Sequence, residues 1–445
     1  MHASLLIRKG LILDPSSKQE RAADVRLKQG TVVEIGRDLK PAAGEATLDA
    51  SGLWIAPGFV DLHTHLREIG QADREDIATG TRAAAAGGFT CVVAMANTNP
   101  PIDDAGILTL LLERIDEKAH IEVLPVACVT RGMQGAELVN MVELAEMGVA
   151  AFSDDGLPVT NLAVLRRALE YARLADRLVI SHAEDRDLSA AGAITEGAVA
   201  TRMGLPGIPR AAETAAIARE IEVARDVGCR LHFAHVSCAA SVELIRAARA
   251  AGVNVTADAT PHHLCLTVEE IGGYDTSFKM NPPLRTRADQ QALVEGLKDG
   301  TIDAVATDHA PHTAADKSLP FDQAPCGVIG LETAFPLTLE RLVREEKMDK
   351  LEFIALLTTR PAAVLGLPVP AIQTGQPANF VVLDPEHQWI YDATKGFSRS
   401  RNSPFHGRRL TGRCLVTFCG GDTVHKDDAL VTPRLKSGDF SAMPG

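Results

Sequence analysis

The chain has 445 residues, more than the usual size of one domain, so we expect a large domain and a smaller one. Hydrophobic residues make up 46% of it and charged residues 23%, values typical of a globular protein, which argues against a disordered or fibrous class. Asp and Glu number 58 against 45 Lys and Arg, and the net charge of −13 argues against binding to nucleic acid or to anionic lipid.

We expect neither export nor insertion into a membrane. The first residues contain only a three-residue apolar run, Leu5–Ile7, before Arg8, which is too short for the core of a signal peptide. No stretch reaches the roughly 18 apolar residues that a membrane helix needs. The eight cysteines form no CxxC pair, so we expect reduced thiols and a cytoplasmic location.

The two ends of the chain share one pattern. Short apolar stretches in the first 50 residues are separated by Gly, Pro and polar turns, and similar stretches return at 380–383 and 415–418. This pattern is typical of antiparallel strands. We therefore predict a small composite β domain from residues 1–54 and 370–430, followed by a mobile tail at 431–445.

Between the two ends, apolar strand-like runs alternate with helical stretches. The eight runs are Trp54–Asp61, Phe89–Ala94, Ile121–Cys128, Val149–Phe152, Arg177–Ser181, Arg230–Ala234, Val253–Ala257 and Ile302–Thr307. Eight such units over about 310 residues match the size and order of a (β/α)8 TIM barrel. An open doubly wound sheet also alternates, but it gives no reason for the number eight. We predict an α/β fold with a catalytic barrel at 55–369 and an active site at the carboxyl ends of its strands.

The predicted helices include Glu75–Ala86, Leu162–Ala175 and Ala212–Val227. Gly87 and Gly88 follow the first of these, where a helix C-cap favours glycine. The first helix is therefore predicted to end at this glycine pair.

Residue types that bind metals follow five of the runs. His63 and His65 end the first run, and because residues i and i+2 of an extended segment point to the same side, both imidazoles can face one point. Asp154 and Asp155 stand in a Ser-Asp-Asp-Gly segment after the fourth run. The fifth, sixth and eighth runs are followed by His182, His235 and Asp308.

Each of these residues also has an ordinary structural interpretation, as a hydrogen-bonded core histidine or as an aspartate that caps a helix or turn. Four histidines and two aspartates at one end of one barrel nevertheless favour a metal site. Imidazole and carboxylate ligands suit catalytic Zn²⁺ with positions open for water, and such a set can also hold two ions that share a bridging carboxylate.

Six segments carry a more specific pattern. They are Pro57–Glu68 (PGFVDLHTHLRE), Asn97–Pro100 (NTNP), Ser153–Gly156 (SDDG), Lys279–Arg285 (KMNPPLR), Asp308–His312 (DHAPH) and Gly330–Thr333 (GLET). With them the chain resembles, over nearly its whole length, the class I dihydroorotases of the amidohydrolase superfamily. The HxH pair with a later Asp marks only the superfamily, whereas HLRE, NPPLR and DHAPH are specific to this branch.

The resemblance implies a metal-dependent enzyme that interconverts N-carbamoyl-L-aspartate and L-dihydroorotate with one or two Zn²⁺ ions. The implied metal ligands, with Asp155 as the bridge, are His63, His65, Asp155, His182, His235 and Asp308. The implied substrate contacts are Arg67, Asn97, Asn281, His312 and the backbone of Cys326 and Gly327. We also expect a homo-oligomer, and some relatives have aspartate carbamoyltransferase as a partner.

Two of these residues have a chemical role that can be stated further. Asp308 is the expected general acid and base, which takes a proton from the attacking water and delivers it to the ring nitrogen, and which reverses these roles in cyclisation. Arg67, two residues after His65, can present its guanidinium to the substrate carboxylate close to the metal. The structural alternative for Arg67 is a salt bridge with Glu68 or Asp73.

The segment 309–327 is long for a connection between a strand and a helix, so we predict that it orders over bound substrate. We expect His262 and His263, after the seventh run, to be structural. At four positions the chain departs from the family pattern, namely Ile69, Ala96, Ala183 and Cys326. None of these departures removes a ligand or a charge, so they bear on loop shape more than on the reaction.

Two other functions stay open. Hydantoinases, dihydropyrimidinases and allantoinases share the fold but typically bridge their metals with a carboxylated lysine from strand four, and this chain has no lysine between Lys118 and Lys279. An inactive scaffold homologue that partners aspartate carbamoyltransferase would usually have lost ligand histidines, and here all of them are present.

Overall fold

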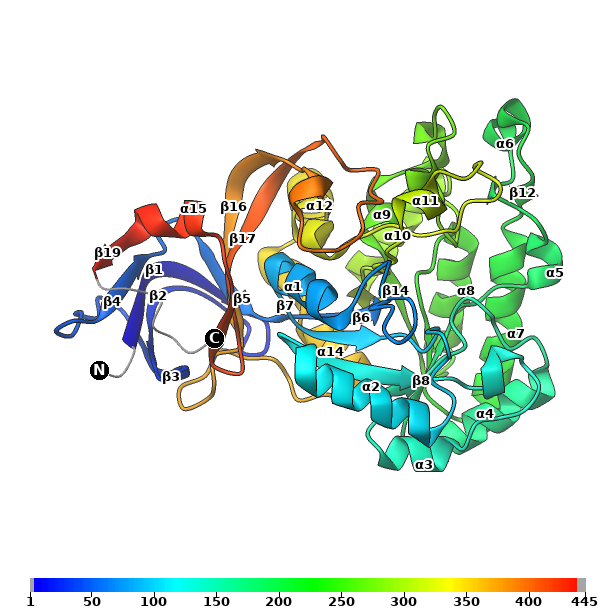
Figure 1. Cartoon of the computed structure of the whole chain (residues 1–445), viewed down its shortest axis with the longest axis horizontal. Helices are drawn as coiled ribbons and strands as arrows, with labels where there is room; N and C mark the ends of the chain where they lie inside the picture. Colours follow the sequence, from blue (N-terminus) through cyan, green and yellow to red (C-terminus); the bar gives the residue numbers. More distant parts are fainter. Residues whose placement is uncertain (1–3, 438–445) are drawn as a thin grey trace.

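The computed structural model describes residues 4–437 and confirms the predicted barrel. Eight parallel strands lie side by side in chain order (Figure 1). They are β6 (Phe59–Thr64), β7 (Phe89–Ala94), β8 (Glu122–Ala127), β9 (Ala151–Phe152), β10 (Leu178–Ser181), β13 (Leu231–Phe233), β14 (Val255–Ala259) and β15 (Ala304–Val305). Thr64 of β6 and His309, which follows the last strand, form an isolated bridge, so the barrel is nearly closed.

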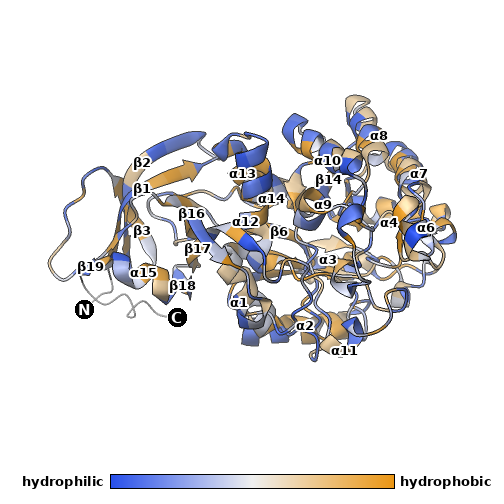
Figure 2. Cartoon of the chain, turned by 90° about the horizontal axis from the view of Figure 1, so that it is seen from above, coloured by the Kyte–Doolittle hydropathy of each residue, from blue (hydrophilic) through white to orange (hydrophobic). Residues whose placement is uncertain are grey.

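Helices follow the barrel strands along the chain. The longer ones are α1 (Ile77–Gly87), α2 (Ala105–Lys118), α3 (Met141–Glu146), α4 (Leu162–Leu174), α7 (Ala211–Val227), α8 (Ala239–Ala250), α10 (Arg287–Asp299), α13 (Lys350–Leu357) and α14 (Thr359–Leu365). Shorter elements are α5 (Arg186–Ser189), β11 (Ile194–Thr195), α6 (Ala198–Met203), β12 (Gly207–Ile208), α9 (Pro261–Cys265), α11 (Ala314–Lys317) and α12 (Ala334–Thr338). The face of α10 with Leu293, Val294 and Leu297 is buried, and Figure 2 shows hydrophilic colour on other parts of this helix.

Helix α1 illustrates how local sequence sets these boundaries. Asp76 caps its first turn in a capping box with Thr79, which satisfies backbone N–H groups that have no partner inside the helix. Gly88 ends the helix in the left-handed conformation, with φ of 95°. At Gly87, a Cβ atom would lie 2.2 Å from the Leu331 carbonyl oxygen, so only glycine lets the two backbones approach this closely. The predicted end at the glycine pair is confirmed.

Both ends of the chain form a second, nine-stranded sheet, as predicted. Its strands are β1 (Ser4–Asp14), β2 (Gln19–Lys28), β3 (Thr31–Gly36), β4 (Ala46–Asp49), β5 (Trp54–Pro57), β16 (Phe380–Ile390), β17 (Arg409–Cys419), β18 (Asp422–Lys426) and β19 (Leu435–Ser437). The sheet joins the two ends where β5 pairs with β1 on one side and with β16 on the other. Figure 1 shows it beside the barrel, with blue N-terminal strands next to orange and red C-terminal ones.

Two predicted boundaries differ from the structure. The run Trp54–Asp61 is not one barrel strand, because β5 belongs to the terminal sheet and the barrel strand β6 begins at Phe59. Gly58 separates them, and a Cβ there would lie 2.1 Å from Thr90 Oγ1. Regular structure also extends past residue 430, where the sequence suggested a mobile tail: the helix α15 (Asp428–Val431) precedes β19, which pairs with β4 through Leu435 and Leu48. The rest of the predicted tail, residues 438–445, lies outside the described residues.

The terminal sheet has its own apolar core and also contacts the barrel. Leu5, Val25 and Phe380 belong to the core of the sheet itself. Trp54 packs instead against Phe335 of the barrel, with ring centroids 6.4 Å apart. Among residues 4–437, no helix is long and apolar enough to cross a membrane.

Candidate active site

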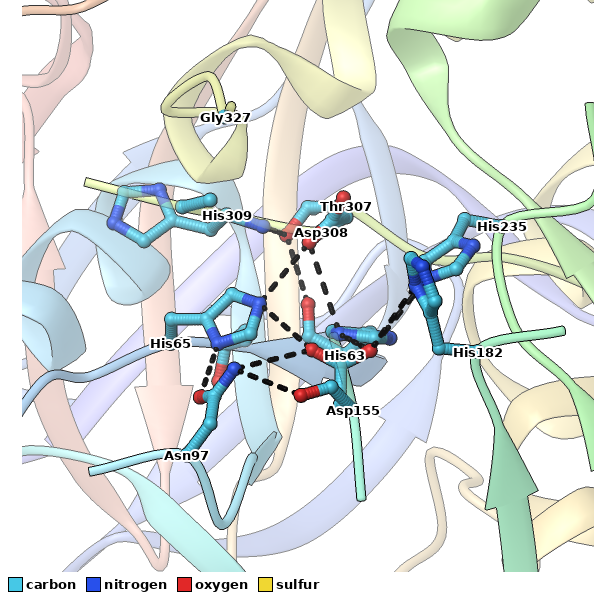
Figure 3. A network of polar contacts seen from close by, with 12 residues as sticks. His63, His65, Asn97, Asp155, His182, His235, Thr307, Asp308, His309 and Gly327 are labelled. Atoms are coloured by element: carbon cyan, nitrogen blue, oxygen red, sulfur yellow. Dashed lines mark hydrogen bonds and ion pairs between the residues drawn. The ribbon is translucent and has the colours of Figure 1, made fainter. Parts of the chain in front are cut away.

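The six predicted metal ligands converge at the carboxyl ends of the barrel strands (Figure 3). His63 lies in β6, and the others follow a strand within three residues. They are His65 after β6, Asp155 after β9, His182 after β10, His235 after β13 and Asp308 after β15. None of the six residues is more than 7% exposed. Parallel strands therefore bring together residues that are far apart in the sequence.

Asp155 lies at the centre of the cluster. Its Oδ1 is 3.4 Å from His63 Nε2, and its Oδ2 is 3.5 Å from His65 Nε2. The same Oδ1 is 3.6 Å from His235 Nε2 and 3.7 Å from His182 Nδ1. Two groups of donor atoms, His63-His65-Asp155 and Asp155-His182-His235, thus share one carboxylate, and the atoms of each group lie within 4.8 Å of one another.

Asp308 lies on the side of the first group. Its Oδ1 is 3.2 Å from His65 Nε2 and 3.7 Å from His63 Nε2. Its backbone has φ of 46°, a conformation that non-glycine residues rarely adopt and that occurs mainly where the surroundings enforce it. The carboxylate therefore faces the same centre as the histidines.

The unpaired atoms of the cluster fit bound cations. His63 Nε2 and Asp155 Oδ1 are buried and have no hydrogen-bond partner among the described residues. His182 Nδ1 and His235 Nε2 face each other at 3.0 Å. Buried polar atoms without partners are costly, and a cation between them would satisfy them. Imidazole and carboxylate donors without a thiol are a set that suits Zn²⁺.

The electrostatics of the cluster also favour cations. Burial raises the pKa of Asp155, but the nearby imidazoles, His63 first, outweigh it and hold that pKa well below its usual range. For Asp308, burial is likewise outweighed by the hydrogen bond with His65 and by the charge of His63, and its pKa is lowered. Burial lowers the pKa of His63, but Asp155 and Asp308 raise it to about 10. Both carboxylates are ionised at neutral pH and face the same centre, so the cluster presents negative charge to a bound cation.

Asn97 holds two members of the cluster in position. Its Oδ1 is 2.8 Å from His65 Nδ1 and accepts the hydrogen bond of that N–H, so Nε2, which faces the carboxylates, is the nitrogen of His65 that can bind a cation in place of its proton. Its Nδ2 donates to Asp155 Oδ2 at 3.3 Å. The sequence predicted Asn97 as a substrate contact, whereas its contacts in the structure are with these two residues.

Two further aspartates support the cluster from behind. Asp258, on β14, accepts hydrogen bonds from the His235 backbone N–H and from His232 Nε2, both at 2.8 Å. It thereby supports the unusual backbone of His235, whose φ is 41°. Asp154 accepts from the backbone N–H groups of Val129 and Thr130, so the first aspartate of the pair is structural and the second faces the cluster. Asp258 was not predicted, although an acid that directly follows the apolar run Val253–Ala257 was a visible signal.

Asn281 and a second missed residue, Glu184, adjoin His182. Asn281 Nδ2 is 3.1 Å from His182 Nε2 and donates to Glu184 Oε2 at 3.3 Å. Glu184 Oε2 is also 3.4 Å from His182 Nε2. Burial raises the pKa of Glu184, but His182 and Asn281 lower it to about 2. An ionised Glu184 can accept the Nε2–H of His182 and leave its Nδ1 free toward Asp155.

Arg67 is buried, and its guanidinium contacts backbone rather than an acidic side chain within the part of the chain that the structure describes. It is 8% exposed, and its Nε donates to the Pro311 carbonyl at 3.2 Å. Among the described residues no carboxylate oxygen lies within 4.0 Å of it, and Glu68, its predicted structural partner, pairs with Lys118. Burial and the charge of Arg74 lower the pKa of Arg67 to about 10, so it stays charged at neutral pH. A buried guanidinium of this kind is poised to bind an anion.

The segment 309–327 lies against this arginine. His312 Nε2 is 2.7 Å from the Cys326 carbonyl oxygen and 3.5 Å from the guanidinium of Arg67. The Gly327 N–H donates to the Lys279 carbonyl at 2.9 Å, so this predicted substrate contact is engaged by the protein itself. Burial and the charge of Arg67 lower the pKa of His312 to about 3, which makes it neutral at physiological pH.

His262 and His263 follow β14, where the sequence predicted structural residues. His263 Nε2 is 3.0 Å from the Pro282 carbonyl oxygen, and its Nδ1 is 2.8 Å from Thr260 Oγ1. His262 packs on the His263 ring, with centroids 4.5 Å apart. These contacts agree with a structural role for His263.

A family model described as dihydro-orotase-like matches residues 52–241 of the chain. A dihydroorotase of Geobacter sp. (strain M21) is 44% identical over 423 residues, which are 95% of this chain and 99% of that protein. A dihydroorotase of Pelotomaculum thermopropionicum is 46% identical over 423 residues, with the same coverage of both proteins. The chain belongs to the dihydroorotase family.

Solved structures of related proteins have the same fold as this chain. A dihydropyrimidinase from Brevibacillus agri NCHU1002 superposes with a TM-score of 0.83 at 26% identity and covers 95% of each chain. An L-hydantoinase from Arthrobacter aurescens superposes with a TM-score of 0.85 at 24% identity and covers 96% of each chain. These neighbours share the barrel with the terminal sheet, but their sequences are much further from this chain than those of the dihydroorotases.

The departures from the family pattern leave the cluster intact. Ala96 and Ala183 are buried, and Ile69 packs against the barrel core. Cys326 contributes its carbonyl oxygen to His312, which any residue could do. At the centre, where a hydantoinase would need a carboxylated lysine, this member of the dihydroorotase family has Asp155, and the strands β9, β10 and β13 contain no lysine.

Proposed function

We propose that the protein is a dihydroorotase, which catalyses the reversible cyclisation of N-carbamoyl-L-aspartate to L-dihydroorotate in pyrimidine biosynthesis. One observation carries this proposal: a cluster of metal-ligand side chains that shares Asp155 lies near a buried, charged Arg67 that has no acidic partner within 4.0 Å among the described residues. The cluster accounts for amide chemistry, and the arginine accounts for a substrate that carries a carboxylate on its ring. The names of the relatives point to the same reaction.

The residues that would hold the metal are His63, His65, Asp155, His182, His235 and Asp308, and this set would fit one Zn²⁺ ion or two, with Asp155 as the carboxylate common to both groups of donors. We propose Zn²⁺ as the metal, because the donors are imidazole and carboxylate. When bound, Zn²⁺ supplies Lewis-acid polarisation of the amide carbonyl and activates the attacking water.

The protein's own side chains bind the substrate and move the proton. Arg67 forms a charge-assisted pair with the ring carboxylate, and His312 lies beside it as a neutral hydrogen-bonding group. In hydrolysis Asp308, ionised and next to His65, accepts the proton of the attacking water and delivers it to the ring nitrogen that leaves. In cyclisation the same carboxylate accepts the proton of the attacking amide nitrogen and returns it to the carboxyl oxygen that leaves as water. Asn281 and the backbone of Cys326 and Gly327 remain assigned to substrate binding by family resemblance.

Metal analysis of the purified protein, combined with assays of both reaction directions, tests this function. We expect bound zinc, cyclisation of N-carbamoyl-L-aspartate and ring opening of L-dihydroorotate, and loss of both activities on chelation with recovery on adding Zn²⁺. A protein that holds zinc but turns over neither compound would contradict the proposal.

The same assays separate the two alternatives. A hydantoinase or dihydropyrimidinase would hydrolyse dihydrouracil, which lacks the carboxylate, at least as well as dihydroorotate. An inactive scaffold that partners aspartate carbamoyltransferase would turn over none of these substrates, and it would not need the six proposed metal-ligand side chains. The convergence of all six ligand residues argues against the scaffold.

Further expectations follow the family. We propose a cytoplasmic enzyme, which is supported by eight free cysteines. We also propose that it forms homo-oligomers and that aspartate carbamoyltransferase can bind it. Exposed apolar side chains on α4, Tyr171 at 45% and Leu174 at 73%, are candidates for such contacts. Sedimentation of the protein alone and mixed with the carbamoyltransferase tests both.

A further inference from the structure

Asn402 joins the two ends of the segment that carries His312. It lies in the connection between β16 and β17 of the terminal sheet and is 5% exposed. Its Nδ2 donates to the carbonyl oxygens of Ala310 and Gly327, both at 3.0 Å. Its Oδ1 accepts from the His312 N–H at 3.1 Å, and its own carbonyl accepts from Ile329 N–H at 3.0 Å. One amide side chain thus satisfies one donor and two acceptors of the loop backbone.

Neighbours of Asn402 in the same connection hold the base of this loop. Ser398 Oγ donates to Glu75 Oε2, and the Arg399 N–H donates to Glu75 Oε1 at 2.9 Å. Glu75 in turn lies 3.4 Å from Nε2 of His309, the residue after Asp308. The connection, residues 391–408, therefore reaches from the terminal sheet to both ends of the loop at the barrel mouth.

The contacts of Asn402 bear on the geometry of the substrate site. His312 donates one hydrogen bond within the loop, from its Nε2 to the Cys326 carbonyl at 2.7 Å, and one to Asn402 Oδ1, from its backbone N–H at 3.1 Å. Gly327 follows Cys326 directly, so Asn402 fixes the relative position of these two halves of the loop. At Gly327, which has φ of 136°, a Cβ would lie 2.7 Å from Ala310 Cβ. The two ends of the loop therefore lie closer together than any residue other than glycine would allow.

We propose that Asn402 is a positioning residue for the segment 309–327, which we call the substrate loop. Through Asn402, the connection between β16 and β17 of the terminal sheet controls substrate affinity. Asn402 touches neither the metal ligands nor Arg67 in any contact described above; it acts by holding His312 and the Cys326 carbonyl in register beside Arg67. This inference rests on the proposed function for its kinetic part only, since the order of the loop can be measured without substrate.

The substitution Asn402→Asp tests the role atom by atom. It keeps the shape and the acceptor for the His312 N–H, but it removes both donated hydrogen bonds and places a carboxylate against the carbonyls of Ala310 and Gly327. Asn402→Ala removes all three side-chain contacts. If the alanine variant does not fold, Asn402→Ser is used in its place.

The matched control is Thr417→Val. Thr417 is also a fully buried residue of the terminal sheet, and its Oγ1 donates to the barrel carbonyl of Ala85 at 2.6 Å, away from the loop. Valine removes that hydrogen bond at similar volume, so the control reports what a general loss of contact between sheet and barrel does.

Three measurements are made on the zinc-loaded full chain: metal content, amide exchange of residues 309–329 without ligand, and KM and kcat for dihydroorotate. We expect unchanged metal, at least about tenfold faster exchange in the loop and at least about a tenfold higher KM in the Asn402 variants, with a smaller change in kcat. Added dihydroorotate should slow exchange of the loop in the parent protein. Thr417→Val should leave both loop exchange and KM within about twofold of the parent.

Loop exchange and KM within twofold of the parent in folded Asn402 variants would overturn the proposal, as would equal effects in Thr417→Val. If the parent itself shows no turnover, the proposed function fails, while the exchange data still decide whether Asn402 orders the loop.

Discussion

The cluster around Asp155, which we propose binds the metal, and the segment 309–327, which with Arg67 we propose binds the substrate, lie at the same barrel mouth but are built in different ways. The cluster residues lie on barrel strands or within three residues of them, and buried acids such as Asp258 hold their backbone. Arg67 also follows β6 by three residues, but its side chain contacts the segment 309–327, which carries His312 and Cys326, and hydrogen bonds from side chains to backbone hold these groups. The strand pairing of the barrel thus fixes the position of the proposed metal ligands, whereas loop contacts fix the position of the groups that we propose select the substrate.

The largest effect should come from removing a ligand. His63→Ala removes one of the imidazoles beside the Asp155 carboxylate, so we expect metal affinity to fall by more than about a hundredfold and turnover to be lost with it. This loss exceeds the one expected when a residue that only hydrogen-bonds to a metal ligand is removed. Metal analysis and dihydroorotate assays on the same sample measure both. His425→Ala is the control, because His425 is equally a buried histidine but lies in β18 of the terminal sheet. Normal metal content and kcat in His63→Ala would refute the ligand assignment.

A large effect on rate alone should come from Asp308→Asn. The amide keeps the shape of the carboxylate but cannot accept and return a proton, so we expect kcat to fall by at least about a hundredfold. Metal must be measured in the same preparation, since Asp308 lies 3.2 Å from His65. A kcat within a few-fold of the parent at full metal occupancy would place the proton transfer on another group.

On the loop side of the comparison, Arg67→Met should change specificity more than metal binding. Met retains much of the stem but not the charge, so we expect normal metal content and a fall in kcat/KM for dihydroorotate of about tenfold to a hundredfold. The parent should prefer dihydroorotate strongly over dihydrouracil, and the variant should lose most of that preference. Because this is a ratio, a general loss of folded protein cannot imitate it. Equal discrimination by both proteins would favour the hydantoinase-like alternative.

The difference between the two regions also explains what the sequence could predict. Apolar runs and the residues after them gave the eight strands and all six cluster residues, because a parallel barrel brings strand ends together whatever the loops do. The boundary at Gly58 was missed, since β5 and β6 form one continuous apolar run and only their partners distinguish them.

Long-range hydrogen bonds could not be predicted in this way. Asn402 is 90 residues beyond His312 in the chain, in a segment that has no periodic pattern, so nothing local indicates that it contacts the loop. Glu184 was equally hidden, because a Glu two residues after a ligand histidine is ordinary in a polar loop. β19 was missed because three residues are too few to give a recognisable strand pattern.

Asn97 belongs to both regions, and the smallest predicted effect distinguishes its two possible roles. The family resemblance assigns it to the substrate, but its side chain accepts from His65 Nδ1 and donates to Asp155. Outer partners of ligand histidines fix the tautomer, and their loss typically weakens metal binding. We therefore expect Asn97→Ala to reduce metal affinity by about tenfold, as measured by competition with a chromophoric chelator.

The control for Asn97→Ala is Asn161→Ala, which removes an asparagine that caps α4 through the Ala163 N–H at 2.9 Å and should cost stability without changing metal affinity. A pure substrate contact predicts the opposite result for Asn97→Ala, namely a higher KM at unchanged metal affinity. If added zinc restores kcat/KM of Asn97→Ala fully, the residue acts through His65 and Asp155. If saturating zinc leaves KM raised, Asn97 also touches the substrate. This one side chain would then contribute both to the position of the proposed metal ligands and to substrate binding.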